Sequence, residues 1–390
     1  MKRRLFVASF QVIFWLLAIL TMYSMWDKWM LDGPHGPYRW MGMDFAPFYV
    51  GVQEMFSGAD PYSAETTLKI QEVVYGGPAN GEDPMMFVYP AWLFLIIAPF
   101  TALPLPWAVS IYSGTLAWAL VNLFLNLANQ WGAGKSRYVR IFWVLVLTLG
   151  SLPFLVISVT KGQLGYLSLL ALWAAAKIWD RSPFWAGVVL GLAIIKPTVT
   201  VIPTAGYLLW ALHERNGKML AGFVSVMTLL FFSSILAVGN WLPGYVQMLS
   251  ITGGMPVIWS LAALPTVLRT LYLAGFLALI LAAGWTSLRT KDRQFWLAAT
   301  TLSGIATFPM RWIYDLFLGI LIPAHQKFMQ PWLSGLTTLA ILAPWALVFL
   351  PNALRANTII IGLPLLWATV MTAILVKNWK HTHNETSTTP

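Results

Sequence analysis

The chain has no cysteine and very few charged residues. Of its 390 residues only 10% are Asp, Glu, Lys or Arg, whereas about a quarter of the residues of a soluble domain are charged. The absence of cysteine excludes disulfides and thiolate chemistry, although it does not identify the compartment. No H-E-x-x-H, G-x-S-x-G, D-x-D or phosphate-loop motif is present. We therefore do not favour a zinc or redox enzyme, and we predict neither a metal ion nor a cofactor.

Long hydrophobic runs make up most of the chain. Hydrophobic residues account for 58% of the sequence, and Trp alone occurs 22 times. Apolar runs of roughly 17 to 25 residues, long enough to cross a bilayer, recur from end to end. These runs predict an all-α polytopic membrane protein with roughly ten to thirteen transmembrane helices. No soluble-looking linker divides the chain, so we expect residues 1–378 to form a single unit and residues 379–390 to form a disordered cytoplasmic tail.

Basic residues lie mostly at the ends of the apolar runs. The net charge of +10 would suggest nucleic acid binding in a soluble protein, but this placement follows the positive-inside rule, so no nucleic acid partner is predicted. Lys2, Arg3 and Arg4 place the N-terminus in the cytoplasm. The first apolar run is too long for a signal peptide and lacks a small-x-small cleavage site, which favours an uncleaved anchor over a cleaved signal. We expect a multi-pass protein of the cell (inner or plasma) membrane, in contact with membrane lipids.

Acidic residues are concentrated in one early loop. Nine of the fourteen lie between positions 27 and 83, in a loop over 26–87 that follows a crossing from the cytoplasm and is therefore expected outside. Apolar spacing predicts a helix over 45–56 that lies in the membrane interface. Ser63 is a candidate N-cap for a second helix over 64–74, which Gly76 and Gly77 end. The loop is predicted to be folded.

Proline interrupts several of the later apolar runs. The runs at 183–212 and 295–324 are long enough to be hairpins broken at Lys196-Pro197 and at Pro309. The run at 87–104 is expected to be re-entrant or interfacial, because the basic residues at 135–140 can then face the cytoplasm. The stretch at 239–260 is a second predicted outer element, which either cradles a lipid tail or lies on the bilayer.

A few cations lie next to apolar runs and outside the cytoplasmic loops. Charge at the bilayer centre costs at least about 2.5–3.5 kcal/mol, so such residues usually line a cavity or pair. The predicted topology brings Lys161, Lys196 and Arg311 toward the outer side, where they would form a cationic pocket for an anionic lipid headgroup. Snorkelling is the alternative for Lys161. Arg311 and Asp315, four residues apart, form either part of the site or a structural ion pair.

Asp44 heads the amphipathic helix in the outer loop. Asp is a preferred N-cap, so capping is one explanation. Pro47, predicted at the third helical position, has no N–H and removes one capping partner, which favours a functional role for Asp44. Asp60 precedes a proline, and this pattern marks either a turn or a site residue.

Four sequence blocks occur in a fixed order along most of the chain. They are MDFAPFYVGVQEMFSGADPYS, FVYPAWLFLIIAPFTALP, KGQLGYLSLLALWAAAK with AGVVLGLAIIKPTVTVIP, and FPMRWIYDLFLGILIPA. Together they resemble the glycosyltransferase family 87 branch of the GT-C superfamily, membrane enzymes that use polyprenyl-phosphate sugars and are related to the α-mannosyltransferases. The resemblance implies a GT-C-like helix bundle with a long first outer loop, and an inverting sugar transfer on the outer face.

The resemblance matches Asp44 to the first-loop aspartate that such enzymes use as general base. A carboxylate at this place can accept the proton of an acceptor hydroxyl, and cations stabilise the leaving phosphate. The predicted donor-binding residues are Lys161, Gln163, Lys196, Arg311, Asp315, Tyr89, Asp60 and Tyr62.

The expected donor is a polyprenyl-phosphate sugar, of the mannose type before pentoses, and the expected acceptor is a lipid or glycan. A lipid or solute transporter or flippase and an outer-leaflet polysaccharide ligase are the alternatives. The sequence does not predict the oligomeric state.

Overall fold

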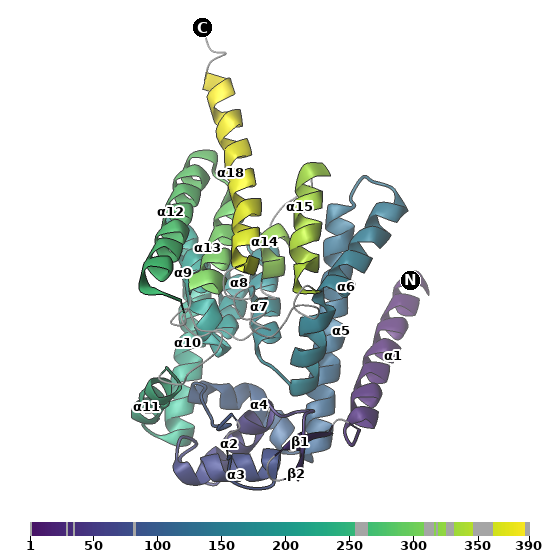
Figure 1. The fold of residues 1–390 in the computed structure, drawn as a ribbon, viewed down its shortest axis with the longest axis vertical. Helices are drawn as coiled ribbons and strands as arrows, with labels where there is room; N and C mark the ends of the chain where they lie inside the picture. Colours follow the sequence, from purple (N-terminus) through teal and green to yellow (C-terminus); the bar gives the residue numbers. More distant parts are fainter. Residues whose placement is uncertain are drawn as a thin grey trace. The chain divides into compact units, whose positions relative to one another are not determined.

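The structure is predominantly helical. The computed structural model describes residues 2–28, 30–33, 36–80, 83–253, 264–307, 316, 319–324, 331–345 and 362–386. Within these ranges the strands are β1 (Met30–Gly33) and β2 (Gly36–Arg39), which pair antiparallel with Met30 opposite Arg39. All longer elements are helices, as the sequence predicted for a helical membrane protein (Figure 1).

The chain divides into two compact units, each assembled from separate segments. The first unit contains residues 1–122, 156–166 and 225–255, and the second contains residues 123–155, 167–224 and 256–390. From the sequence, residues 1–378 were expected to form a single unit. Three long helices pass from one unit to the other, so no linker marks the division in the sequence.

The first unit carries the early loop. Its elements are α1 (Lys2–Met25), β1, β2, α2 (Ala46–Phe56), α3 (Ala64–Tyr75), η1 (Ala91–Leu93), α4 (Phe94–Thr101), the first part of α5 (Leu105–Trp131), the end of α6 (Arg137–Lys161), the second part of α10 (Gly217–Val238) and α11 (Leu242–Gly253). Helix α2 packs against both α3 and α4. These three helices and the hairpin lie together (Figure 1), so the loop is folded, as predicted.

Local sequence signals determine the limits of α3. The Ser63 hydroxyl accepts a hydrogen bond from the Thr66 amide at 3.1 Å, as an N-cap does. Gly76 ends the helix in the left-handed conformation at φ +74°, which glycine adopts without a Cβ clash. Both signals were predicted from the sequence, and both are confirmed.

The apolar face of α2 is directed differently from the prediction. The helix over 45–56 was expected to lie in the membrane interface, but Phe45, Phe48, Tyr49 and Val52, on its apolar face, are all buried within the protein. Phe48 packs edge-to-face on Tyr89, with ring centroids 4.5 Å apart. Helical periodicity identifies which residues share a face, and it does not distinguish lipid from protein as the neighbour.

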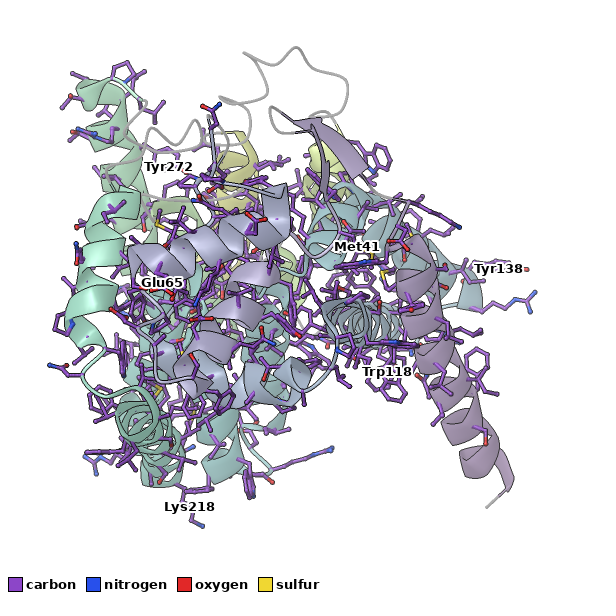
Figure 2. The ribbon with its side chains drawn as sticks, turned by 90° about the horizontal axis from the view of Figure 1, so that it is seen from below. Met41, Glu65, Trp118, Tyr138, Lys218 and Tyr272 are labelled. Atoms are coloured by element: carbon purple, nitrogen blue, oxygen red, sulfur yellow. The ribbon has the colours of Figure 1, made fainter. Side chains whose placement is uncertain are left out.

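Helix α1 is joined to α5 by polar side chains. Trp15 Nε1 donates to Thr115 Oγ1 at 2.9 Å, and Trp118 Nε1 donates to Gln11 Oε1 at 2.8 Å. Trp118 lies on the side of α5 that faces α1 (Figure 2). A Cβ at Gly114 would lie 2.7 Å from the backbone of Ile19, so the two helices also approach closely. Small residues and interhelical hydrogen bonds are typical of helix pairs in membranes.

The second unit is made of helices throughout its described part. Its elements are the remaining parts of α5, α6 and α10, with α7 (Gly165–Ile178), α8 (Pro183–Leu192), η2 (Ala193–Ile195), α9 (Pro197–His213), α12 (Thr266–Thr290), α13 (Arg293–Thr307), α14 (Leu321–Ala324), α15 (Pro331–Leu342), η5 (Ala343–Trp345) and α18 (Leu363–Thr386). The predicted break of the 183–212 run is confirmed, because helical structure stops at Lys196 between η2 and α9.

Helices α9 and α13 form the main packed pair of the second unit. A Cβ at Gly206 would lie 2.5 Å from Thr300, and one at Gly304 would lie 2.6 Å from Pro203, so both glycines are required for this approach. Trp296 Nε1 also donates to the Gly206 carbonyl at 2.8 Å.

A cluster of polar and charged side chains connects helices of the second unit. Arg293 makes an ion pair of 2.7 Å with Asp180, and Glu214 accepts a hydrogen bond of 3.0 Å from Trp179 Nε1.

Among the described residues, three helices are long and apolar enough to cross a membrane. They are α5, α10 and α12, with a fourth candidate if the parts of α6 on either side of Pro153 count as one bent span. The described residues also contain five shorter apolar helices of 10–17 residues, at 9–25, 91–101, 165–178, 183–195 and 363–376. The protein is therefore a helical membrane protein, but length and composition do not give the expected ten to thirteen spans in the part of the chain that the structure describes. Proline breaks and short helices divide runs that look continuous in the sequence.

Two further expectations concern the second half of the chain. Helix α18 continues to Thr386, whereas a disordered tail was predicted from residue 379. The expected break at Pro309 lies outside the described residues.

Candidate active site

A short turn before α2 is attached to the end of α6 through backbone hydrogen bonds. The Gly42 amide donates to the Thr160 carbonyl at 2.8 Å, and the amides of Asp44 and Phe45 each donate to the Lys161 carbonyl at 3.0 Å. Helix α6 ends at Lys161, so its last carbonyls lack partners within the helix and accept these amides instead. Residues more than a hundred positions apart in the sequence thus meet within the first unit.

The side chain of Asp44 is held by Gln163. Gln163 Nε2 donates to Asp44 Oδ2, and only 3% of Gln163 is exposed to solvent, while Asp44 is half-buried. A hydrogen bond from a buried amide fixes the position of the carboxylate. The partial exposure of Asp44 leaves it accessible to a ligand.

Asp44 does not cap α2. The N-cap of this helix is Phe45, which makes no side-chain capping bond, and Pro47 lies within the first two helical positions rather than at the third. The N-cap is one residue later than expected, so the capping explanation for Asp44 is wrong. Its carboxylate accepts a hydrogen bond from Gln163 Nε2.

Gly162 allows the turn to approach the end of α6. It has φ +79°, and a Cβ at this position would lie only 2.6 Å from the Cβ of Phe45. No L side chain fits there without displacing one of the two segments. The absence of a side chain at position 162 thus makes room for Phe45.

Lys161 lies on the face of an aromatic ring. Its Nζ is 4.1 Å from the ring centroid of Trp40, and Trp40 Nε1 donates to Thr160 Oγ1 at 3.2 Å. The cation–π contact and this hydrogen bond together fix where the ammonium group lies. Lys161, for which snorkelling was the alternative to a role in the site, therefore has a defined position next to the turn that carries Asp44.

Aromatic rings pack against the turn from the inside. Phe45 is fully buried, with its ring centroid 5.0 Å from that of Tyr112 and 6.0 Å from that of Phe100. The Tyr112 hydroxyl donates to the Gln163 carbonyl at 3.0 Å. Tyr112 thus fixes the backbone of Gln163, and the Gln163 side chain in turn fixes Asp44. The two bonds in series make the arrangement rigid.

Asp60, Tyr62 and Tyr89 form a separate group in the same unit. Asp60 is exposed, and its Oδ1 accepts a hydrogen bond from the Tyr62 amide at 2.9 Å, the pattern of an Asx-turn. The buried Tyr62 hydroxyl donates to the Tyr89 carbonyl at 2.7 Å. Burial is the main cause that raises the pKa of Tyr62 above its ordinary value. The turn explanation for Asp60 is supported, and the Tyr62 hydroxyl holds the chain at Tyr89.

The other predicted cations cannot be added to this group. Lys196 belongs to the second unit, where it is only 4% exposed and lies between η2 and α9. Its carbonyl accepts a hydrogen bond from Thr200 Oγ1 at 2.8 Å. Arg311 and Asp315 lie outside the described residues. The convergence of Lys196 and Arg311 with Asp44 stays a prediction.

Sequence reasoning missed two residues of the site. Trp40 precedes Asp44 by four positions, and an aromatic residue this close to a candidate carboxylate is a signal that could have been used. Tyr112 lies inside the apolar α5 helix, where an isolated tyrosine gives no comparable signal.

The site combines a fixed carboxylate, a buried amide and a positioned ammonium group. Within the described ranges no three His, Cys, Asp or Glu side chains gather in a way that could hold a metal ion. Such a set can accept a proton at the carboxylate and attract an anion at the ammonium group.

No family model, curated protein or solved structure matches this chain. The geometry of the site and the four sequence blocks are therefore the basis for assigning a function.

Proposed function

We propose that this chain is a membrane glycosyltransferase that moves a sugar from a polyprenyl-phosphate donor to a lipid or glycan acceptor. The observation that carries the proposal is the half-buried carboxylate of Asp44, which Gln163 holds beside the end of α6, where Lys161 supplies a positive charge. The four sequence blocks that resemble family 87 support the same function. They also favour a GT-C-like bundle and a site that faces the outside of the cell membrane.

Asp44 acts as the general base. It takes the proton from the acceptor hydroxyl while the hydroxyl oxygen attacks the anomeric carbon of the donor sugar. The bond between the anomeric carbon and the phosphate oxygen breaks, and its electron pair leaves with the polyprenyl phosphate. One attack on the side opposite the leaving group gives inversion at the anomeric carbon.

Lys161 stabilises the leaving phosphate. The phosphate gains negative charge as the bond breaks, and a cation already in position lowers the barrier without reorganisation. Trp40 supplies that position, because its ring lies under the ammonium group. Lys196 and Arg311 are additional candidates for phosphate binding, and Tyr89 is a candidate for contact with the sugar, of the mannose type first.

The proposal is tested by substituting Asp44 with asparagine in the full-length protein. The Asp44→Asn side chain keeps an oxygen that can accept from Gln163 but cannot take a proton, so the fold is retained. We expect transfer from a synthetic polyprenyl-phosphate mannose to membrane-extracted acceptors to fall about a hundredfold to ten-thousandfold, the range for a lost general base. Product is measured by mass spectrometry of the acceptor fraction.

A matched control is Glu65→Gln, which removes a carboxylate of the same loop. Glu65 is 80% exposed and pairs with Lys69 on the surface of α3, so its loss should leave transfer unchanged. Full transfer by the Asp44→Asn variant would refute the catalytic role. Movement of the donor lipid across the membrane without any glycosylated product would favour the transporter alternative.

A further inference from the structure

Helix α11 follows a candidate membrane span and contains no charge. No Asp, Glu, Lys or Arg occurs between Lys218 and Arg269. Helix α10, one of the three candidate spans, ends at Val238, and α11 begins four residues later. Figure 1 shows α11 turned crosswise at the end of α10. A helix in this place lies along the plane of the membrane if α10 crosses it.

One face of α11 is bound to the rest of the first unit. Trp241, just before the helix, donates from Nε1 to Ser234 Oγ at 2.9 Å, and its ring centroid is 5.5 Å from that of Trp92. Tyr245 packs on Tyr62, with ring centroids 6.1 Å apart. This aromatic face fixes the rotation of α11 about its own axis.

That rotation leaves two further faces exposed. Leu242, Val246 and Leu249 are spaced by four and three residues, so they share one strip of the helix surface, and Val246 is 61% exposed. Gln247 and Ser250, also exposed, lie on the adjacent strip, about 100° further around the helix. We call these the apolar strip and the polar strip.

We propose that α11 is an in-plane membrane helix whose apolar strip enters the lipid at the boundary between headgroups and acyl chains. Near the end of α10, the preceding candidate span, Leu236 is also 87% exposed. The neighbouring polar strip remains at the water side. A helix with one protein face, one apolar face and one polar face matches the three environments that meet at a membrane surface.

The consequence concerns the height of the early loop above the membrane. A Cβ at Gly244 would lie 3.0 Å from the Tyr62 ring, so α11 and the segment around Tyr62 are in close contact. Lipid that holds α11 therefore also holds Tyr62, and with it Tyr89, at the membrane surface. This inference does not depend on the proposed transferase activity.

The absence of cysteine gives a direct test. Single-cysteine variants Val246→Cys and Gln247→Cys carry an environment-sensitive fluorophore in the full-length protein, reconstituted in phosphatidylcholine nanodiscs. Leu249→Cys and Ser250→Cys form a second adjacent pair. Each label reports one position, because the chain contributes no other thiol. Quenching is measured with a lipid that carries a nitroxide near the head of its acyl chain, and separately with aqueous iodide.

We expect loss of fluorescence with the nitroxide lipid, and protection from iodide, at positions 246 and 249. Positions 247 and 250 should show the opposite pattern. Equal responses within each adjacent pair would overturn the proposal, and so would protection of 246 and 249 from both quenchers, which would mean that a protein covers the apolar strip. Because all four side chains are exposed, the labels are not expected to disturb folding.

Discussion

Substitution of Gly162 with alanine tests the close approach that forms the candidate site. Gly162 has φ +79°, and the added Cβ would lie 2.6 Å from Phe45 Cβ. Two separate penalties follow. The left-handed conformation costs an L residue about 1–2 kcal/mol, and forcing an extra methyl group against a packed neighbour costs about 1–3 kcal/mol. The free energy of unfolding should therefore fall by about 2–5 kcal/mol in Gly162→Ala.

Gly58 provides a control that has the same left-handed backbone conformation but no atom close to an added Cβ. Its φ is +80°, but a Cβ at Gly58 would meet nothing within 4 Å. The free energy of unfolding of Gly58→Ala should therefore fall only by the cost of the left-handed conformation, about 1–2 kcal/mol. The two variants thus differ by the contact with Phe45 alone.

The assay is the midpoint of thermal unfolding in detergent, followed by circular dichroism. Gly162→Ala should unfold at a clearly lower temperature than Gly58→Ala. The steric push on Phe45 also displaces the neighbouring Asp44, and a displacement of about 1 Å can lower a rate about a hundredfold. Equal midpoints for the two variants would refute the packing argument, because the 2.6 Å approach would then be absent.

Two further predictions concern pH and the first helix. Burial raises the pKa of Tyr245 to about 12, above the value of about 10 for an exposed phenol. The stability that the protonated Tyr245 contributes is therefore complete below pH 10 and is lost as the pH rises through 12. In the Tyr245→Phe variant, the free energy of unfolding should depend less on pH in this window. An unchanged pH dependence would contradict the burial of Tyr245. Gln11→Leu removes the acceptor of Trp118 Nε1 and Asn122 Nδ2, and should lower stability by about 1 kcal/mol, since such interhelical bonds average about 0.6 kcal/mol each. Phe10→Leu, at an exposed neighbouring position, is its control in the same thermal assay, and equal midpoints would count against the bonds.

Local features of the fold were predictable from the sequence. The cap at Ser63 and the end at Gly76 depend on the chemistry of single residues, and both occur as expected. The break at Lys196-Pro197 follows from the ring of proline, which cannot continue a helix from the preceding turn. Each of these signals acts within one or two helical turns, where sequence determines structure most directly.

The number of spans was not predictable in the same way. Hydropathy detects apolar runs, but it does not detect where a run stops being one helix. The run at 87–104, which was expected to be re-entrant or interfacial, contains η1 and the short α4, which together reach only from Ala91 to Thr101. Short helices of this kind are as apolar as true spans, so composition alone overestimates the crossings.

The central contact of the candidate site depends on distant residues. Asp44 was identified as important, but its partner Gln163 lies 119 positions away, and nothing in a single sequence pairs them. The direction of Phe45 was mistaken for a related reason, because Tyr112 and Phe100 become its neighbours only after the chain folds. Tertiary contacts of this kind are beyond periodicity and capping rules.

The attachment of the Asp44 turn to α6 has a consequence for how the site can be modified. Three main-chain hydrogen bonds, each from an amide to a carbonyl, join the two segments. The side chain at position 161 takes no part in them, so a substitution such as Lys161→Gln should change the local charge and leave the location of the Asp44 backbone intact. The fold thereby separates the placement of the carboxylate from the chemistry of its cationic neighbour, and residue 161 becomes a position where affinity for an anion can be adjusted independently.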